Sequence, residues 1–509
     1  MHGKINMRSF LKILLLVAVL FFCLPSLHAQ KRKEARIKYR ADYVEVDKRI
    51  GRGAQRLLDN VEFIHGGAKM YCDSAYFFSK KNSLDAFDNI FINQGDTLFL
   101  YGDLLHYDGN TKKATITGNV KLVNKETTLK TEKLYYELGI GKGYYDNYGH
   151  TVNKDNTLES IKGFYYTQQK TFVFHDSVII TNPDYVMYSD TVEYNTESGI
   201  ASFFGPTDVI GDSSHIYGEE GWYDTQLDLA ELKHNAWASN EKQTIYGEYI
   251  YYNKNTGDGL ARDQVRILEN ERSVILLGNK AKYNDNTEYA FLTDSAQFIQ
   301  FTPEGDSLFL HADSILSYPD TAGNKIVFAY YKVRFYRYNV QGICDSLVYS
   351  FADSTVRMYF NPVLWTGSHQ VSANQIDILT KNQNLEKMYL YNASFIASKV
   401  DTSFFNQIKG KNMICHFSEK QLRQIDVMGN GQSVYFPLDD DTSDIVGVNL
   451  SECSNIKIFL ENGEVHRINF YVKPNGGMYP LDQAPENKLR LKGFQWLDSL
   501  RPRDRYDIF

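Results

Sequence analysis

The chain has 509 residues and a formal net charge of −7 at neutral pH, with 37 tyrosines against 11 prolines. The modest acidic balance argues against a nucleic-acid-binding protein, which needs a basic face to neutralise phosphates. Tyrosine-rich sequence punctuated by Asp, Asn and Gly at short intervals is typical of strands and turns. The composition therefore predicts an all-β fold.

The first predicted element is a secretory signal peptide over residues 1–29. A basic lead is followed by an unbroken apolar run, Ile13 to Leu24, and Ala29 provides a small residue at the expected cleavage site. The apolar run is too short to span a bilayer as a helix. The mature protein is therefore expected to be exported and to begin near Gln30.

A hairpin-sized unit then repeats along residues 30–300. LFLYGDLLHY (98–107) has strand character, DGNTKK forms a turn, and ATITGNVKLV (114–123) alternates apolar and polar residues as a half-buried strand does. A fixed period in this range is the signature of a stacked array. An aromatic residue closes the first strand of each unit at intervals of 28 to 35 residues: Phe77, Tyr107, Tyr136, Tyr166, Tyr194, Tyr223, Tyr252, Tyr283, Tyr318 and Tyr349.

Two further regularities predict that each strand is creased near its middle, so that one chain builds two facing sheets. In the first strands a small residue precedes an acidic one, as in Gly102-Asp103. In the second strands the middle position is often Gly or Asp, which are typical of bends and bulges. These middle residues are Asp59, Asp88, Gly118, Asp176, Asp263 and Asp294.

The cysteines and the polar residues give no indication of a reaction centre. No CxxC pair, Gly-x-Ser-x-Gly elbow, His-Glu-x-x-His helix or phosphate-cradling glycine loop is present. Cys72 and Cys344 occupy the Gly102 position of their repeats, which suggests small buried residues, and whether they or Cys415 and Cys453 form disulfides is left open. The sequence therefore predicts a protein that is not an enzyme and that has no metal site or cofactor.

The later part of the chain departs from the regular repeat. Residues 301–446 are interpreted as a divergent continuation of the β-repeats, and residues 447–509 as a C-terminal capping or docking segment. The segment 456–472, IKIFLENGEVHRINFYV, predicts a hairpin with a Glu-Asn-Gly turn. A short helix is expected from Glu486 to about Leu500, ended by Pro502.

The repeated pattern resembles the OstA-like family of periplasmic lipopolysaccharide-transport proteins, the LptA type. YGDLLHY (101–107) and ATITGNV (114–120) carry it most clearly, and the resemblance covers residues 37–300 well and 301–437 loosely. It implies an extended, V-sectioned β-jelly roll, or β-solenoid, whose apolar interior holds acyl chains. It also implies a periplasmic location, with a peripheral association with the outer membrane left open, and lipopolysaccharide or a related lipid as ligand.

The partners and the function follow from this resemblance together with physical chemistry. The unpaired end strands can add to other OstA-like folds or to a second copy. Since burial contributes about 0.8 kcal/mol per methylene, an apolar trough would hold acyl chains. The predicted function is a non-catalytic bridge or chaperone that moves lipopolysaccharide, or a similar lipid, toward the outer membrane.

The residues predicted to line the trough share the inward face of their strands: Leu105, Tyr107, Ile116, Val120, Leu122, Phe172, Phe174, Val178, Ile180, Val192, Tyr194, Ile250, Tyr252, Val265 and Ile267. Three alternatives remain open at the level of sequence. They are a structural or adhesion solenoid with a filled core, a β-helix enzyme acting on polysaccharide, and an outer-membrane barrel.

Overall fold

The computed structural model describes residues 36–46, 53–269, 273–301, 307–381, 384–419, 421–439, 441–442, 444–461 and 463–509. The predicted signal peptide, with its cleavage site after Ala29, lies outside the described residues. The chain divides into two compact units, Met1–Gly143 and Tyr144–Phe509.

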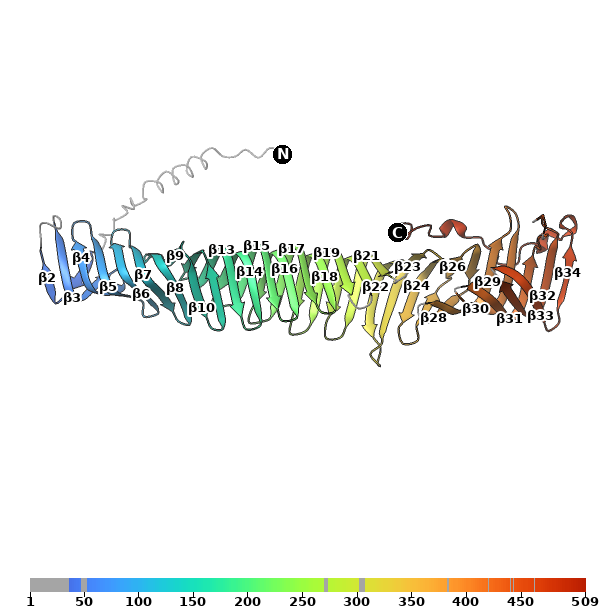
Figure 1. Ribbon diagram of the computed structural model, residues 1–509, viewed down its shortest axis with the longest axis horizontal. Coiled ribbons are helices and arrows are strands. Elements are labelled where there is room, and N and C mark those ends of the chain that lie inside the picture. The colour runs from blue at the N-terminus through green and yellow to red at the C-terminus, as the bar shows by residue number, and fades with distance from the viewer. Residues whose placement is uncertain are drawn as a thin grey trace, which may run out of the picture. The chain divides into compact units, whose positions relative to one another are not determined.

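Unit 1 consists of antiparallel strands, and from β3 to β8 each strand pairs with the next one along the chain (Figure 1). Two strands of three residues each, β1 and β2, pair side by side with β3. The strands are β1 (Lys38–Arg40), β2 (Tyr43–Glu45), β3 (Ala54–His65), β4 (Ala68–Phe78), β5 (Ser83–Gln94), β6 (Leu98–Asp108), β7 (Lys113–Asn124) and β8 (Thr127–Glu137).

Unit 2 continues the same antiparallel pattern, and the boundary between the units falls within β9 (Lys142–Tyr145). Its regular strands are β10 (Gly149–Asn153), β11 (Asn156–Ser160), β12 (Lys162–Tyr166), β13 (Thr171–Asn182), β14 (Tyr185–Asn195), β15 (Ile200–Gly211), β16 (Ser214–Asp224), β17 (Leu229–Asn240), β18 (Gln243–Asn253), β19 (Asp258–Glu269), β20 (Val274–Asn284) and β21 (Tyr289–Phe301). The later strands are β22 (Ser307–Pro319), β23 (Lys325–Arg337), β24 (Val340–Ser350), β25 (Thr355–Tyr359), β26 (Val363–Thr366), β27 (His369–Ser372), β28 (Gln375–Lys381), β29 (Asn384–Lys399), β30 (Phe405–Ser418), β31 (Gln421–Tyr435), β32 (Val448–Glu461), β33 (Glu464–Tyr471) and β34 (Asn475–Tyr479).

The predicted creases are confirmed. All six middle residues named from the sequence have positive φ angles, from 58° at Asp263 to 80° at Gly118. At each of them the pairing register shifts, as between Thr117 and Val120 in β7. Glycine adopts positive φ freely, and among the L-residues Asn and Asp adopt it most readily, so the Asp and Gly residues at these positions allow the chain to bend there. The crease divides each long strand into two halves.

The apolar core of each unit lies between the two sets of strand halves. In β7, Ile116, Val120 and Leu122 are buried, whereas Thr115 and Thr117 on the other face are half-buried. The same alternation recurs from strand to strand, since antiparallel partners share a face. The fold is therefore the all-β, creased jelly roll that the sequence predicted.

The strand halves end at two rows of turns, which we call the first lip and the second lip. In the first lip of unit 2, successive turns are joined by backbone hydrogen bonds, such as Lys254 N to Asp228 O at 3.0 Å. The first lip contains turns 79–82, 109–112 and 138–141 in unit 1, and 167–170, 196–199, 225–228, 254–257, 285–288 and 320–324 in unit 2. The second lip contains turns 66–67, 95–97 and 125–126 in unit 1, and 154–155, 183–184, 212–213 and 241–242 in unit 2.

The four cysteines of the described chain are free thiols: Cys72, Cys344, Cys415 and Cys453. Cys72 and Cys344 occupy the place beside the crease that Gly102 occupies in its own strand, as the repeat predicted. Burial raises the pKa of the first three thiols to about 12. At neutral pH they therefore behave as small apolar groups rather than as nucleophiles.

The C-terminal segment confirms one prediction and corrects another. The predicted hairpin is formed by β32 and β33. A continuous helix from Glu486 to Leu500 is not formed, and the segment holds only the short 3₁₀ turns η1 (Leu481–Gln483), η2 (Glu486–Lys488) and η3 (Asp498–Leu500). No helix in the described part of the chain is long and apolar enough to cross a membrane.

The predicted helix does not form because the tail, residues 480–509, lies along unit 2 in an extended form (Figure 1). The buried side chain of Gln407 donates to Leu489 O and accepts from Leu491 N, both at 2.9 Å. Gln370 holds Gln495 O and Leu497 N in the same way, at 2.8 and 2.7 Å. Because these amides satisfy the backbone groups of the tail, the tail does not need a helix to satisfy them.

Candidate functional site

The interior between the strand halves contains the predicted lining residues. All fifteen are buried except Tyr252, which is half-buried. They come from β6 and β7 in unit 1 and from β13, β14, β18 and β19 in unit 2. They therefore lie in the interior, and their contact with lipid remains a prediction.

The interior is filled by its own side chains in this structure. Ile116 and Phe174 have no exposed surface. Aromatic rings stack within unit 2, with centroids 4.0 Å apart for Tyr165 and Phe172 and 5.3 Å apart for Phe172 and Phe174. A guest molecule would therefore enter only where the two lips separate.

In unit 1, side-chain hydrogen bonds join the two lips. The Tyr107 hydroxyl, at the end of β6 beside the first lip, lies 2.7 Å from Nδ1 of His65, at the end of β3 beside the second lip. The Tyr136 hydroxyl donates to Gln94 Oε1 at 2.9 Å, and Gln94 Nε2 donates to Leu138 O at 3.0 Å. Burial raises the pKa of Tyr107, so this hydroxyl stays protonated and can donate.

The same contact recurs in unit 2, where the Tyr194 hydroxyl donates to Asn153 Oδ1 at 3.2 Å. Burial raises the pKa of Tyr194 as well. In all three contacts the partner lies 41 or 42 residues before the tyrosine. Three of the aromatic residues that mark the repeat therefore also join the two lips.

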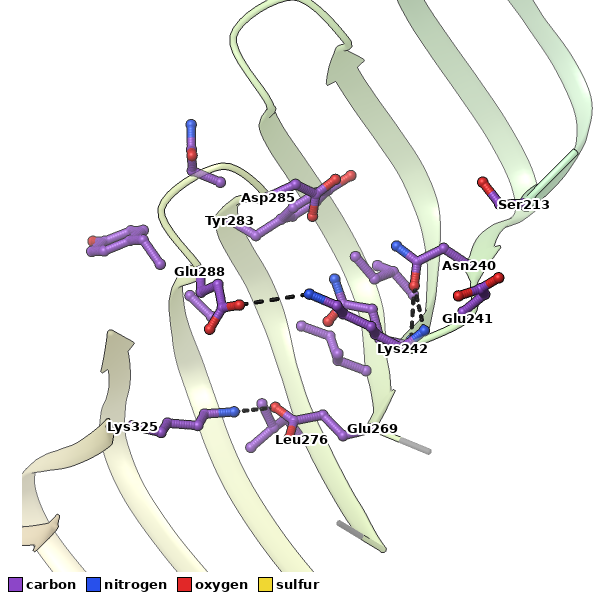
Figure 2. Close-up of a pocket in the computed structure, with 16 residues that line it drawn as sticks. Ser213, Asn240, Glu241, Lys242, Glu269, Leu276, Tyr283, Asp285, Glu288 and Lys325 are labelled. Atoms are coloured by element: carbon purple, nitrogen blue, oxygen red, sulfur yellow. Dashed lines mark hydrogen bonds and ion pairs between the residues drawn. The ribbon is translucent and has the colours of Figure 1, made fainter. Parts of the chain in front are cut away.

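Between β18 and β23 the lips are joined by ion pairs instead (Figure 2). Lys242 of the second lip lies 3.6 Å from Glu288 of the first, and both side chains are largely exposed, at 78% and 64%. Lys325, the first residue of β23 beside the first lip, pairs with Glu269 at the end of β19, and both side chains are mostly buried, at 20% and 16% exposure. The Lys242–Glu288 pair therefore lies at the surface, and the Lys325–Glu269 pair lies deeper between the lips.

A cavity of about 410 Å³ lies between these two ion pairs. Its lining includes the apolar side chains of Ile245, Ile267 and Leu276, which belong to the inward face of β18, β19 and β20. Much of the remaining wall is polar and comes from residues in or beside the two lips, as Figure 2 shows for Asn240 and Glu288. The cavity therefore leads from an exposed polar rim to the apolar interior.

Burial affects two titratable groups on the cavity wall. It raises the pKa of the Asp285 carboxyl, which lies in the first lip. It also raises the pKa of the Tyr283 hydroxyl, which therefore stays protonated. Tyr283 is the aromatic residue that closes its repeat, and its ring stacks on Tyr252 at 6.2 Å.

The contacts between the lips are what the sequence predictions missed. The periodic tyrosines were recognised, but their partners His65, Gln94 and Asn153 were not. The signal that could have found them is a polar residue at the end of a second strand, about 42 residues before each tyrosine. Ile267 was predicted to line the interior, and the cavity lining adds Ile245 and Leu276 on neighbouring strands.

The contacts that join the lips differ in kind from the contacts that join the strands. The contacts that join the lips are side-chain hydrogen bonds and ion pairs, whereas the strands are joined by backbone ladders. Separating the lips would therefore leave every ladder intact. Hydrogen bonds between neutral side chains contribute about 1 kcal/mol each, so the opening is inexpensive compared with unfolding.

Comparison with known proteins places the chain in a family. The family model described as "OstA-like protein" matches residues 34–190 and 186–302. The crystal structure of LptH, the LptA-homologous periplasmic component of the lipopolysaccharide transport device of Pseudomonas aeruginosa, matches at 12% identity and a TM-score of 0.12, over 34% of this chain and 84% of LptH. No curated protein matches the chain. Because the two family matches together span residues 34–302, more than half of the 509 residues, the chain belongs to the OstA-like family.

Proposed function

We propose that this protein is a non-catalytic periplasmic carrier that holds the acyl chains of lipopolysaccharide, or of a similar lipid, and moves the lipid toward the outer membrane. The interior of each unit provides the binding surface. Other OstA-like proteins, or further copies of the chain, are its partners through the end strands. The OstA-like family match and the signal peptide predicted from the sequence both support this assignment.

One observation carries the proposal: the inward faces of successive strands are apolar, and each contact described above between the two lips involves a side chain. A lipid that separates the lips gains about 0.8 kcal/mol for each methylene that it buries. Several methylenes therefore outweigh the few lip contacts that must break. The exchange keeps the backbone ladders, so the carrier can release the lipid and close again.

A structural or adhesion solenoid with a filled core is the second candidate. The observation in its favour is that residues such as Ile116 and Phe174 are fully buried by other side chains. This candidate needs no opening of the lips. It predicts a protein that is isolated without lipid.

Mass spectrometry of organic extracts from the full chain, purified gently from its own envelope, tests the proposal. The carrier predicts a stoichiometric lipid with several acyl chains. The matched control is the same protein after unfolding in urea and refolding without lipid. Extracts that contain no more lipid than this control would contradict the carrier and favour the filled solenoid.

A further inference from the structure

The cavity between β18 and β23 differs from the other places where the two lips meet in the kind of contact that joins them. At Tyr107, Tyr136 and Tyr194 the lips meet through hydrogen bonds of buried or partly buried groups. At the cavity they meet through the ion pair of Lys242 with Glu288, whose side chains are 78% and 64% exposed. An exposed ion pair contributes only about 0–1 kcal/mol, because water and salt screen it.

The chemistry of the cavity matches a lipid chain better than a polar molecule. Its volume of about 410 Å³ is within the range of about 300–1,000 Å³ typical of ligand pockets. Its floor consists of Ile245, Ile267 and Leu276, which are buried side chains of the interior. Its lining as a whole carries two lysines against four carboxylates, Glu241, Glu269, Asp285 and Glu288, so a free anion has no favourable place there.

Below the rim, a second contact keeps the opening narrow. The Lys325–Glu269 pair is mostly buried, and both residues also line a small apolar cavity with Leu276, Leu292 and Phe298. Separating the buried Lys325–Glu269 pair leaves buried charges without partners, which is strongly destabilising, whereas the exposed Lys242–Glu288 pair separates easily. The outer pair is therefore the contact that yields first.

We propose that this cavity is a side opening through which acyl chains enter and leave the interior of unit 2, with the Lys242–Glu288 ion pair as its latch. The proposal rests on the carrier function proposed above. It gives the lipid a place to cross the lips. The acyl chains pass to Leu276 while the polar headgroup stays outside the rim.

Charge reversal at the latch tests the proposal by kinetics. Full-length protein is mixed with vesicles of phosphatidylethanolamine and phosphatidylglycerol that contain a self-quenched phospholipid with a fluorescent acyl chain, and dequenching reports the transfer. Lys242→Glu places two carboxylates across the opening, so transfer should accelerate about two- to fivefold. The difference should shrink in high salt, because the charges are exposed.

Two variants control for indirect effects. Lys242→Glu combined with Glu288→Lys restores an opposite pair and should restore the wild-type rate. Lys170→Glu reverses the pair of Lys170 with Glu197, which joins two turns of the same lip, and should leave the rate unchanged. Equal rates for wild type, Lys242→Glu and Lys170→Glu would overturn the side opening, as would failure of the double reversal to restore the rate of folded protein.

Photocapture at two adjacent leucines distinguishes the opening from the carrier function itself. A photoreactive residue at Leu276, on the cavity floor, should capture the fluorescent acyl chain, and one at Leu277, which faces outward, should not. Capture at Phe174 but not at Leu276 would overturn the side opening and leave the carrier standing. Capture at neither Phe174 nor Leu276 would overturn both.

Discussion

At the scale of single residues, the repeated motif describes how a crease is held. The Asn119 side chain donates to Asp103 Oδ2 at 2.7 Å, and Asn89 donates to Asp73 in the same way at 2.7 Å. Asn119 itself has a positive φ of 48°. At Gly118 an added Cβ would lie 2.5 Å from Asp103 Oδ2. The Gly-Asp and Gly-Asn pairs of the motif therefore contact each other across the crease, and we call the contact of Asp103 with Gly118 and Asn119 the clamp.

Substitutions at Asn119 should separate the two contributions to this clamp. Asn119→Gly keeps the freedom to adopt positive φ and loses the hydrogen bond, so the free energy of unfolding should fall by about 1 kcal/mol. Asn119→Ala adds the backbone penalty and should lose about 1–2 kcal/mol more. Urea unfolding measures both, with Asp103→Asn, which keeps an acceptor, as the control. Equal losses for Gly and Ala would show that backbone strain has no part.

At the scale of elements, both ends of the strand array are covered by short strands. β1 and β2 pair with β3, and β33 and β34 pair with β32. The Asp42 N–H donates to Asp59 O at 3.0 Å, so by alternation the N–H of Val44 also points toward β3. The N–H groups of Tyr43 and Glu45 point outward, where an added strand would bind.

Proline substitutions should therefore separate docking from folding. Tyr43→Pro and Glu45→Pro remove outward donors, so we expect weaker self-association or weaker binding to an OstA-like partner with little change in the melting temperature. Val44→Pro removes an inward donor and serves as the matched control, since it should disturb the pairing with β3. Sedimentation and thermal melts measure the two effects. If all three prolines weaken binding and folding alike, docking does not use this edge.

The tail is the other element whose role can be tested. The outer face beneath it is apolar, and Phe494 and Trp496 pack on the ring of Phe405 with centroids 5.1 and 5.0 Å apart. Arg334 near the other end of the tail donates to Asp507 O at 2.8 Å. The Gln407 amide binds the tail before these aromatic residues, at Leu489 and Leu491, and the Gln370 amide binds it beside them, at Gln495 and Leu497.

Replacing both Gln370 and Gln407 with Ala should release the tail. Each substitution leaves tail backbone groups without partners, which costs about 1–3 kcal/mol. Trypsin should then cleave faster after Lys492, and the N-terminal sequence of the released peptide identifies that site. Gln375→Ala is the control, because the Gln375 amide donates to Asp377 and not to the tail. Unchanged cleavage in the double variant would contradict the role assigned to the glutamines.

The repeat and the creases could be predicted from sequence because they are local. Alternation and the placement of Asp, Asn and Gly depend on neighbouring residues, and both were read correctly. The lip contacts and the path of the tail could not be predicted, because they join residues far apart, as His65 joins Tyr107 and Gln370 joins Leu497. The helix expected from Glu486 failed for the same reason, since the partners of its backbone lie on distant strands.

At the scale of the whole molecule, the account depends on whether the inward faces meet lipid. The alternation of inward and outward residues along the strands does not decide this, because a filled core and an opening trough place the same residues inside. Ile116, Phe174 and Val178 are buried, and Thr117 faces outward. A bulky inward side chain distinguishes the two. In a filled core it overpacks its neighbours, which costs about 1–3 kcal/mol, whereas an opening trough has room for it.

Photocapture in living cells is the most direct measurement. A photoreactive side chain at Ile116, Phe174 or Val178 should capture lipopolysaccharide or a related lipid, and one at Thr117 should not. Capture of lipid alike from both faces would indicate only contact with a membrane. Capture of protein alone from the inward positions, by folded variants, would contradict the carrier and leave the filled solenoid.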